Sequence, residues 1–192
     1  MNDLIVNGKS VVSGGTFGKV NVNGIVSIEN DVICDTLRLN GVCDITGNVK
    51  VGGKAELDGV CKISGDLDAE TIDFDGHLSV SGNMSAESAA LSAVLSAEGT
   101  FNVGSLDLRF YFGSRVNEIV GSTIKIRRGR LAMTFRSELI EGDIIDIEHC
   151  EIRTVRGDDV VIGKGCRIEK VEYRNELTVH PKASVRETVK LN

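Results

Sequence analysis

Apolar and polar residues alternate along most of this 192-residue chain. Runs in which every second residue is apolar are separated by glycine corners, and the same unit of three runs returns about every 17 residues. The segment LNGVCDITGN at 39–48, for example, returns as LDGVCKISGD at 57–66. Alternation at period two predicts β-strands with one buried face, and a fixed period predicts stacked repeats. The pattern therefore predicts a β-solenoid.

The corner residues define the period. The spacings along the first corner column are 16, 17, 18, 17 and 17 residues, and its members are Gly8, Gly24, Gly41, Gly59, Gly76 and Ala93. Asn or Asp precedes each of these glycines, and all three residue types accept a left-handed backbone at low cost. A second corner column contains Gly47, Gly65, Gly82 and Gly99. Three strands and three corners per unit predict an all-β, single-stranded parallel β-helix with triangular rungs of ~17 residues stacked about 4.8 Å apart. The crossover rule for parallel strands favours a right-handed coil.

One elongated domain is expected over residues 1–192, because each rung buries its apolar edge only against its neighbours. Residues 1–108 form a regular array, and a second array of the same rung size covers residues 145–192. Between them, residues 109–144 break the register and are expected to form irregular rungs. The inward-facing residues expected there are Ile124, Ile126, Leu131 and Met133.

Composition agrees with a narrow solenoid interior. The chain is 41% hydrophobic but only 4% aromatic, with no Trp and one Pro. Proline is disfavoured because it cannot donate to a strand ladder. The five cysteines all fall on inward positions: Cys34, Cys43, Cys61, Cys150 and Cys166. A disulfide or a metal site is the alternative, but small buried hydrophobes in a reducing compartment are favoured. With no signal peptide or apolar run that could span a membrane, a cytoplasmic location is expected.

Catalytic chemistry is not indicated. The three histidines have no obvious partners, and no serine lies in a nucleophile elbow. Asp58 and Asp75 are expected one rung apart, where a cation is conceivable but a solvent-screened corner is favoured. The sequence therefore predicts a protein that is not an enzyme, with no catalytic residues, no cofactor and no metal.

Charge is distributed unevenly. Residues 1–108 carry 6 Lys and Arg against 15 Asp and Glu, whereas residues 109–192 carry 16 against 13. The densest basic stretch, KIRRGRLAMTFR, contains Lys125, Arg127, Arg128, Arg130 and Arg136. These residues are candidates for contact with an anionic surface such as the inner face of the membrane. A solvated face, or contact with the acidic half of a neighbouring subunit, is the alternative. Nucleic acid is not expected as a partner, because the chain is acidic and no stacking aromatics are interleaved.

The two ends of the solenoid are candidate assembly sites. A solenoid ends in open strand edges and an uncovered core, which invite pairing with another chain unless they are capped. Neither end of the sequence shows an amphipathic capping helix. The predicted interface, with a second copy of the chain as partner, consists of Leu4, Ile5, Val6, Leu177, Val179, Val185, Val189 and Leu191. The alternative is a non-polymerising solenoid module that binds a protein client or a membrane surface.

The repeat resembles that of a known family. Units with V-x-V-x-G followed by I-x-G, as in VNVNGIVSIEND and LRLNGVCDITGN, look like those of the bactofilins, which are polymer-forming cytoskeletal proteins of bacteria. The resemblance covers residues 4–108 and, more loosely, 145–192. It implies a right-handed β-helix that polymerises end to end into nucleotide-independent filaments and serves as a scaffold, often near the membrane. The interruption at residues 109–144 departs from a uniform array.

Overall fold

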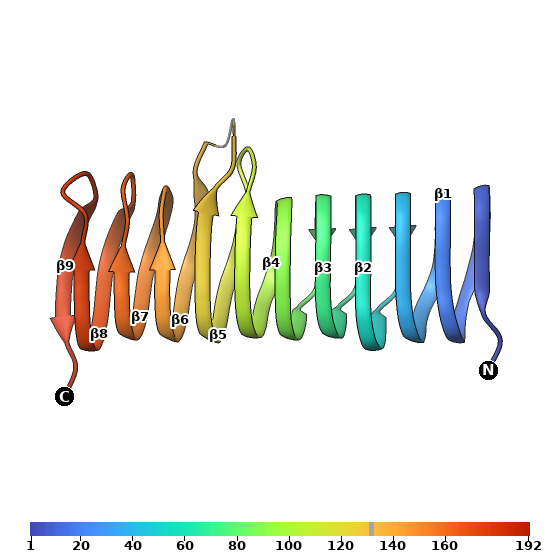
Figure 1. The fold of residues 1–192 in the computed structure, drawn as a ribbon, viewed down its shortest axis with the longest axis horizontal. Coiled ribbons are helices and arrows are strands. Elements are labelled where there is room, and N and C mark those ends of the chain that lie inside the picture. Colours follow the sequence, from blue (N-terminus) through green and yellow to red (C-terminus); the bar gives the residue numbers. More distant parts are fainter. Residues whose placement is uncertain (131–132) are drawn as a thin grey trace.

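The chain folds into an elongated parallel β-solenoid whose termini lie at opposite ends (Figure 1). The computed structural model describes residues 1–130 and 133–192, and it contains no helix within those ranges. Nine strands are hydrogen-bonded in sequence order. They are β1 (Leu4–Ile45), β2 (Val49–Ile63), β3 (Leu67–Val80), β4 (Met84–Phe110), β5 (Arg115–Arg128), β6 (Phe135–Ile147), β7 (Cys150–Ile162), β8 (Arg167–Val179) and β9 (Ser184–Lys190). The predicted all-β solenoid is confirmed.

The pairing register follows the sequence period. Cys43 lies opposite Cys61, and Leu57 lies opposite Phe74, so equivalent positions of successive units stack on one another. Inward residues are buried and outward residues are exposed along each strand, as the alternation predicts. β1 is 42 residues long because its backbone continues in extended conformation around the glycine corners.

The first corner requires glycine for two reasons. Gly59 has a φ of +114°, in the region that L side chains rarely adopt. A Cβ atom on Gly59 would also lie 2.2 Å from the carbonyl oxygen of Gly41, one rung below. The sixth member of the column, Ala93, is not in this conformation. From the next rung onward the corner opens into loops, the first of which begins where the Tyr111 amide donates to the Ala93 carbonyl at 2.8 Å.

The second corner carries a ladder of alternating acid and amide side chains. The Oδ1 atom of Asp31 accepts from the Asn48 amide at 2.7 Å, and Oδ1 of Asn48 accepts from the Asp66 amide at 2.9 Å. In the same way, Oδ1 of Asp66 accepts from the Asn83 amide at 2.7 Å, and Oδ1 of Asn83 accepts from the Thr100 amide at 3.0 Å. Alternation separates the carboxylates by two rungs, so the ladder satisfies corner amides without stacking like charges.

The stretch between the two predicted arrays keeps the register of the solenoid. Leu106 lies opposite Ile124, and Ile124 lies opposite Ile145, so β5 and β6 continue the same stack. Ile124 and Ile126 are buried as predicted. The main irregularity lies at the first corner, in the loop 111–114 between β4 and β5 and in the described residues 129–130 and 133–134 between β5 and β6 (Figure 1).

The prediction that Met133 faces inward is wrong. Its side chain is 72% exposed, because it lies in the β5–β6 loop rather than on a strand. The adjacent interior is filled instead by Phe110 and Phe135, whose ring centroids are 5.7 Å apart. Leu131 lies outside the described residues.

Candidate functional sites: the solenoid ends and a basic ridge

The first rung has no rung on its outer side. Leu4 packs against the core but is only partly buried, as is Val12 of the same rung. Val6 is buried, whereas Ile5 between them is 67% exposed because it points away from the interior. The N-terminal end therefore presents the edges of inward side chains, and Ile5 belongs to a lateral face.

The C-terminal end also leaves apolar residues uncovered. Leu177 lies opposite Val160, and Val179 lies opposite Ile162, at the last positions of two inward columns. Val160 and Ile162 are fully buried, but Val179 is 40% exposed. Val185 occupies the equivalent last position opposite Ile168 and is partly buried.

The final strand is shifted by one residue relative to the prediction. Thr188 lies opposite the buried Val171, whereas Val189 lies opposite the outward-facing Glu172. The predicted inward placement of Val189 is therefore wrong, because a slip of one residue moves a strand's side chains to the other face. Lys190 takes the inward position opposite Tyr173, with its Nζ atom 5.7 Å from the ring centroid. One side of this end is consequently polar.

Both ends retain open strand edges. β9 is hydrogen-bonded to β8 alone, and it is the last strand of the sheet. Beyond it, the amide of the partly buried Leu191 donates to the Tyr173 carbonyl at 2.7 Å, so the chain continues along the same rung. The ends thus combine unpaired backbone groups with partly exposed apolar side chains.

The structure separates one residue of the predicted basic stretch from the others. Lys125 lies between Asp107 and Asp146 on one lateral face, two residues before Arg127, which pairs with the same Asp146. Arg136 lies elsewhere, beyond the β5–β6 loop, where its Nε atom is 3.0 Å from a Glu151 carboxylate oxygen. Arg127, Arg128 and Arg130 remain together near the first corner.

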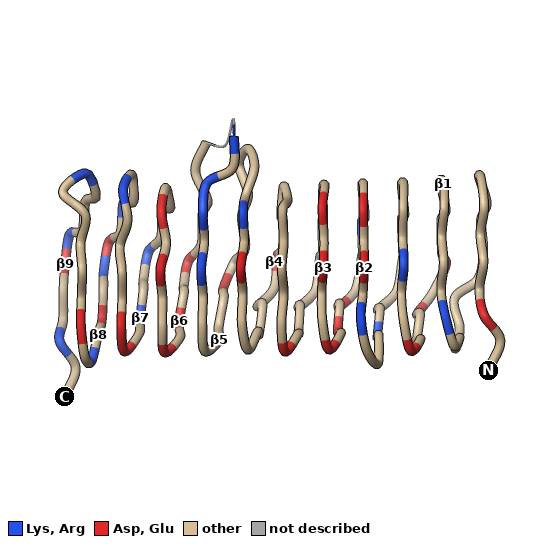
Figure 2. Tube along the Cα trace, viewed as in Figure 1, with Lys and Arg blue, Asp and Glu red and all other residues tan. Residues whose placement is uncertain are grey.

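A basic ridge runs along this corner in the C-terminal half (Figure 2). Its members line two adjacent shallow grooves, of about 420 and 440 Å³, at successive loops of the solenoid. We define the basic ridge as Arg109, Arg127, Arg128, Arg130, Lys164 and Lys182. Arg109, Lys164 and Lys182 are distant from the basic stretch in sequence, and only the rung register brings them to it.

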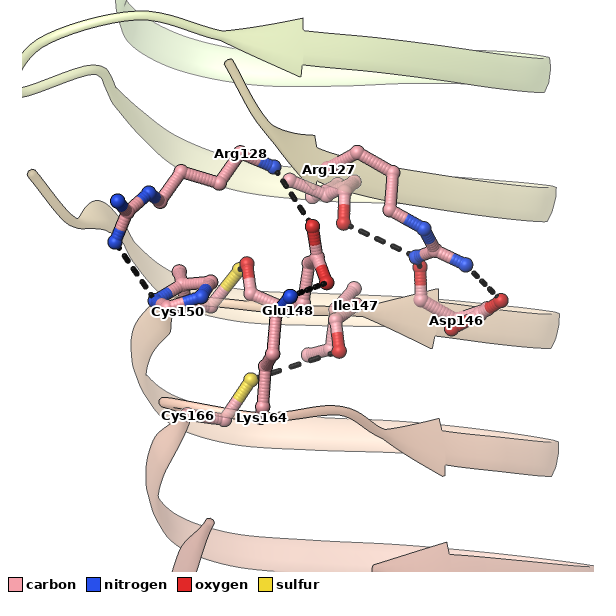
Figure 3. Close-up of polar contacts among 10 residues, drawn as sticks. Arg127, Arg128, Asp146, Ile147, Glu148, Cys150, Lys164 and Cys166 are labelled. Carbon is pink, nitrogen blue, oxygen red and sulfur yellow. Dashed lines mark hydrogen bonds and ion pairs between the residues drawn. The ribbon is translucent and has the colours of Figure 1, made fainter. Parts of the chain in front are cut away.

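Residues of the ridge contact two acidic side chains, Glu148 and Asp146 (Figure 3). The backbone amide of Arg128 donates to Glu148 at 3.2 Å, and the Lys164 ammonium lies 3.9 Å from the same carboxylate. The Arg127 guanidinium is paired with Asp146. Partial burial and the Arg128 guanidinium lower the pKa of His149, which disfavours a further positive charge on that ring.

Five of the ten other basic side chains in residues 109–192 form ion pairs, namely Arg136, Arg153, Arg156, Lys170 and Arg174. Arg156, for example, lies between Glu141 at 2.9 Å and Glu172 at 2.6 Å. Within the described parts of the chain, the side chains of Arg109, Arg128, Arg130 and Lys182 form no such pair. The unneutralised positive charge of the ridge is therefore concentrated at these four residues.

The cysteines are buried free thiols in stacked positions. Burial, followed by the nearby Asp35 carboxylate, raises the pKa of Cys34 to about 11. The pKa of Cys61 is also raised, by its hydrogen-bonding contact with Cys43 and by burial, and that of Cys150 is raised by burial and by its contact with Cys166. Within residues 1–130 and 133–192, no group of three metal-ligating side chains occurs and no buried side-chain nitrogen or oxygen lacks a hydrogen-bond partner.

We predict that stability falls in alkaline solution. Cys34 has its pKa raised from 9.0 to about 11 in the folded state, so the unfolded chain loses this proton first and binds fewer protons above pH 9. The free energy of unfolding must then decrease as the pH rises from 9 towards 11. Melting temperatures followed by circular dichroism should decline less steeply in Cys34→Ala than in the wild type. Identical slopes for the two proteins would contradict the prediction.

The continuous core and the single parallel sheet define an all-β solenoid. Over 231 aligned residues the chain is 30% identical to the uncharacterized protein YhbE of Bacillus subtilis (strain 168), with 98% of each chain covered. It therefore belongs to the YhbE family. It is also 34% identical over 99 residues to the uncharacterized protein YhbF of the same organism, covering 48% of this chain and 42% of YhbF.

Two further comparisons gave no match. No family model matches the chain. No solved structure matches it. Within the described residues, no helix is long and apolar enough to cross a membrane.

Proposed function

We propose that the chain is a structural protein that assembles end to end, through its terminal rungs, into nucleotide-independent filaments that act as a bacterial cytoskeletal scaffold of the bactofilin type. The observation that carries the proposal is the continuation of apolar columns to both ends without a cap. Leu4 and Val12 at one end, and Leu177 and Val179 at the other, have no covering rung.

An end-to-end joint would repeat the contact that already joins each rung to the next. Inside the chain, a rung adds a parallel ladder and a layer of inward side chains at about 4.8 Å. A second copy seated on β8 and β9 would cover Leu177, Val179 and Val185 in the same way. Burial of apolar surface contributes roughly 25 cal/mol per Å², and it is this term that favours assembly over solvated ends.

The polar side of the C-terminal end restricts how a second copy can be placed on it. Thr188 follows the buried apolar column of Val155 and Val171, whereas Lys190 follows Gly157 and Tyr173, and both end side chains are exposed. Polar groups that become buried must find hydrogen-bond partners, so the joint has to place Lys190 at its rim or against an acceptor. Long charged side chains reach solvent in this way by extending their stems along the apolar surface.

A lateral groove is the place where a binding module would hold its partner. One such groove, of about 880 Å³, is lined by Arg136, Glu138, Glu151 and Arg153 among others. Arg136 pairs with Glu151 and Arg153 lies 4.0 Å from Glu138, whereas Arg115, Arg167 and Arg186 of the same groove form no ion pair within the described residues. This groove therefore offers positive charge to a partner, but the open apolar columns lie at the ends, and these favour assembly.

Sedimentation of the purified protein without nucleotide tests the proposal. Above a critical concentration we expect a pelletable polymer, and added nucleotide should not change its amount. Because the terminal contact is largely apolar, moderate salt should leave assembly intact. A monodisperse monomer at all concentrations and salt conditions would contradict the proposal.

A further inference from the structure

Two neighbouring loops project from the solenoid (Figure 1). They are the β4–β5 loop at 111–114 and the β5–β6 loop, of which residues 129–130 and 133–134 are described. The Met133 amide donates to the Phe112 carbonyl at 3.3 Å, which holds the two loops together. Both emerge from the corner that glycine closes tightly in the N-terminal half.

The described part of this projection carries two exposed apolar side chains. Phe112 is 56% exposed and Met133 is 72% exposed, although Phe110 and Phe135 beside them are completely buried. Phe112 also has a φ of +50°, a conformation that bulky residues rarely adopt. Neither core packing nor backbone preference accounts for an aromatic residue at this position. Strained residues of this kind are concentrated at functional sites.

Positive charge surrounds the two apolar residues. Arg109 and Arg130 flank the loops and are exposed, and neither is engaged in an ion pair within the described chain. The ridge continues through Lys164 to Lys182 at the following loops of the same corner. The only acidic side chain lining these grooves within the described residues, Glu148, is engaged by the Arg128 amide and Lys164.

The ridge is arranged in a line along the solenoid axis (Figure 2). Successive loops occur at the same corner because the rungs are in register, so their basic residues can touch one flat surface together. An anionic bilayer satisfies both features of the ridge. Its phosphates attract Lys and Arg at the surface, and its interfacial region accepts aromatic and other apolar side chains. An acidic protein would satisfy the charge but would need a groove for each apolar residue.

We propose that this ridge is a docking surface for an anionic lipid bilayer, with Phe112 and Met133 inserted between headgroups and Arg109, Arg128 and Arg130 bound to phosphates. The solenoid axis then lies parallel to the membrane. The chain as a whole carries a net charge of −6, so attachment depends on this ridge rather than on overall attraction. The proposal does not rest on end-to-end assembly, because a monomer presents the same surface.

Vesicle flotation tests the proposal, since vesicles rise in a density gradient whereas filaments sink. The full chain should float with vesicles containing about 30% phosphatidylglycerol, and not with vesicles of phosphatidylcholine alone. Flotation should weaken as salt rises above ~0.1 M, because the electrostatic contribution is screened. Failure to float with the anionic vesicles at low salt would overturn the proposal.

Two variants separate the apolar contribution from the charge contribution. Phe112→Asn should reduce binding roughly tenfold and leave the melting temperature unchanged or higher, because Asn tolerates a positive φ. The double variant Arg109→Glu and Arg130→Glu should reduce binding by at least about 25-fold, from roughly fivefold for each lost positive charge. Wild-type flotation by either variant would overturn the proposal.

Matched controls lie elsewhere on the surface. Ile144 is 51% exposed at a different corner, so Ile144→Asn should float like the wild type. The double variant Lys50→Glu and Lys62→Glu makes the same change in net charge on the N-terminal half and should retain most of the binding. Equal losses in the control and ridge variants would show that net charge alone governs attachment and would overturn the docking surface.

Discussion

Replacing Leu177 by lysine is expected to abolish end-to-end assembly while leaving the monomer folded. Leu177 stacks on the buried Val160 and has no rung above it. In the monomer, a lysine stem can lie over Val160 with its ammonium group in water. At a joint the same ammonium would be buried without a partner, at a cost of several kcal/mol. A cost of ~3 kcal/mol corresponds to an increase of about 100-fold in critical concentration.

The adjacent residue supplies a control. Thr178 follows Leu177 in β8 but is exposed and lies in the outward column opposite Val161. Thr178→Lys therefore adds the same charge within one residue of the same end and should assemble like the wild type. At the N-terminal end, Leu4→Lys and Ile5→Lys form an equivalent inward and outward pair. Sedimentation should distinguish the members of each pair, and normal assembly by both inward variants would exclude the terminal rungs as the joint.

The second large effect is expected from Gly59→Ala. A methyl group at Gly59 would lie 2.2 Å from the Gly41 carbonyl oxygen, on a backbone with a φ of +114°. Residues forced into such conformations cost about 1–3 kcal/mol, and the steric conflict with a backbone atom adds to this. We expect Gly59→Ala to lower the free energy of unfolding by more than ~3 kcal/mol, as measured by urea denaturation.

Substitutions at two other glycines separate the conformational strain from the steric conflict. Gly8 has a φ of +92°, but a methyl group added there would meet nothing within 4 Å, because no rung precedes it. Gly8→Ala should therefore cost only the conformational strain, about 1–2 kcal/mol. Gly113 has neither a positive φ nor a close neighbour, so Gly113→Ala should be near neutral. If Gly59→Ala were no worse than Gly8→Ala, close stacking of the corners would not be the source of the glycine requirement.

The repeat determines most of the fold because its signal recurs in every rung. Period-two alternation assigned the inward residues, and glycine spacing assigned the stacking partners, such as Cys43 on Cys61. The same reasoning failed where one rung differed from the others. Val189 resembles an inward residue by type, but the register places Thr188 inward, and alternation alone cannot detect a slip of one residue.

The exposed apolar residues and the basic ridge could not be predicted from the sequence, because they are formed by residues that only the fold brings together. The apolar type of Met133 predicts burial, but Met133 lies in a loop, where its side chain is exposed beside Phe112. Arg136 belongs to the basic stretch in sequence, yet the next corner carries it to another face. Arg109 joins the ridge only because the stacked rungs bring it beside Arg127. Loop conformation and inter-rung distance, rather than sequence proximity, determine which charges act together.

Cryo-electron microscopy of the protein assembled without nucleotide tests end-to-end stacking most directly. The account predicts filaments one solenoid wide, with strands perpendicular to the filament axis and a spacing of about 4.8 Å that continues across each joint. The terminal rungs containing Leu4 and Leu177 should lie at the joints. Discrete rods of one subunit, or filaments whose subunits touch only through lateral faces, would contradict the account.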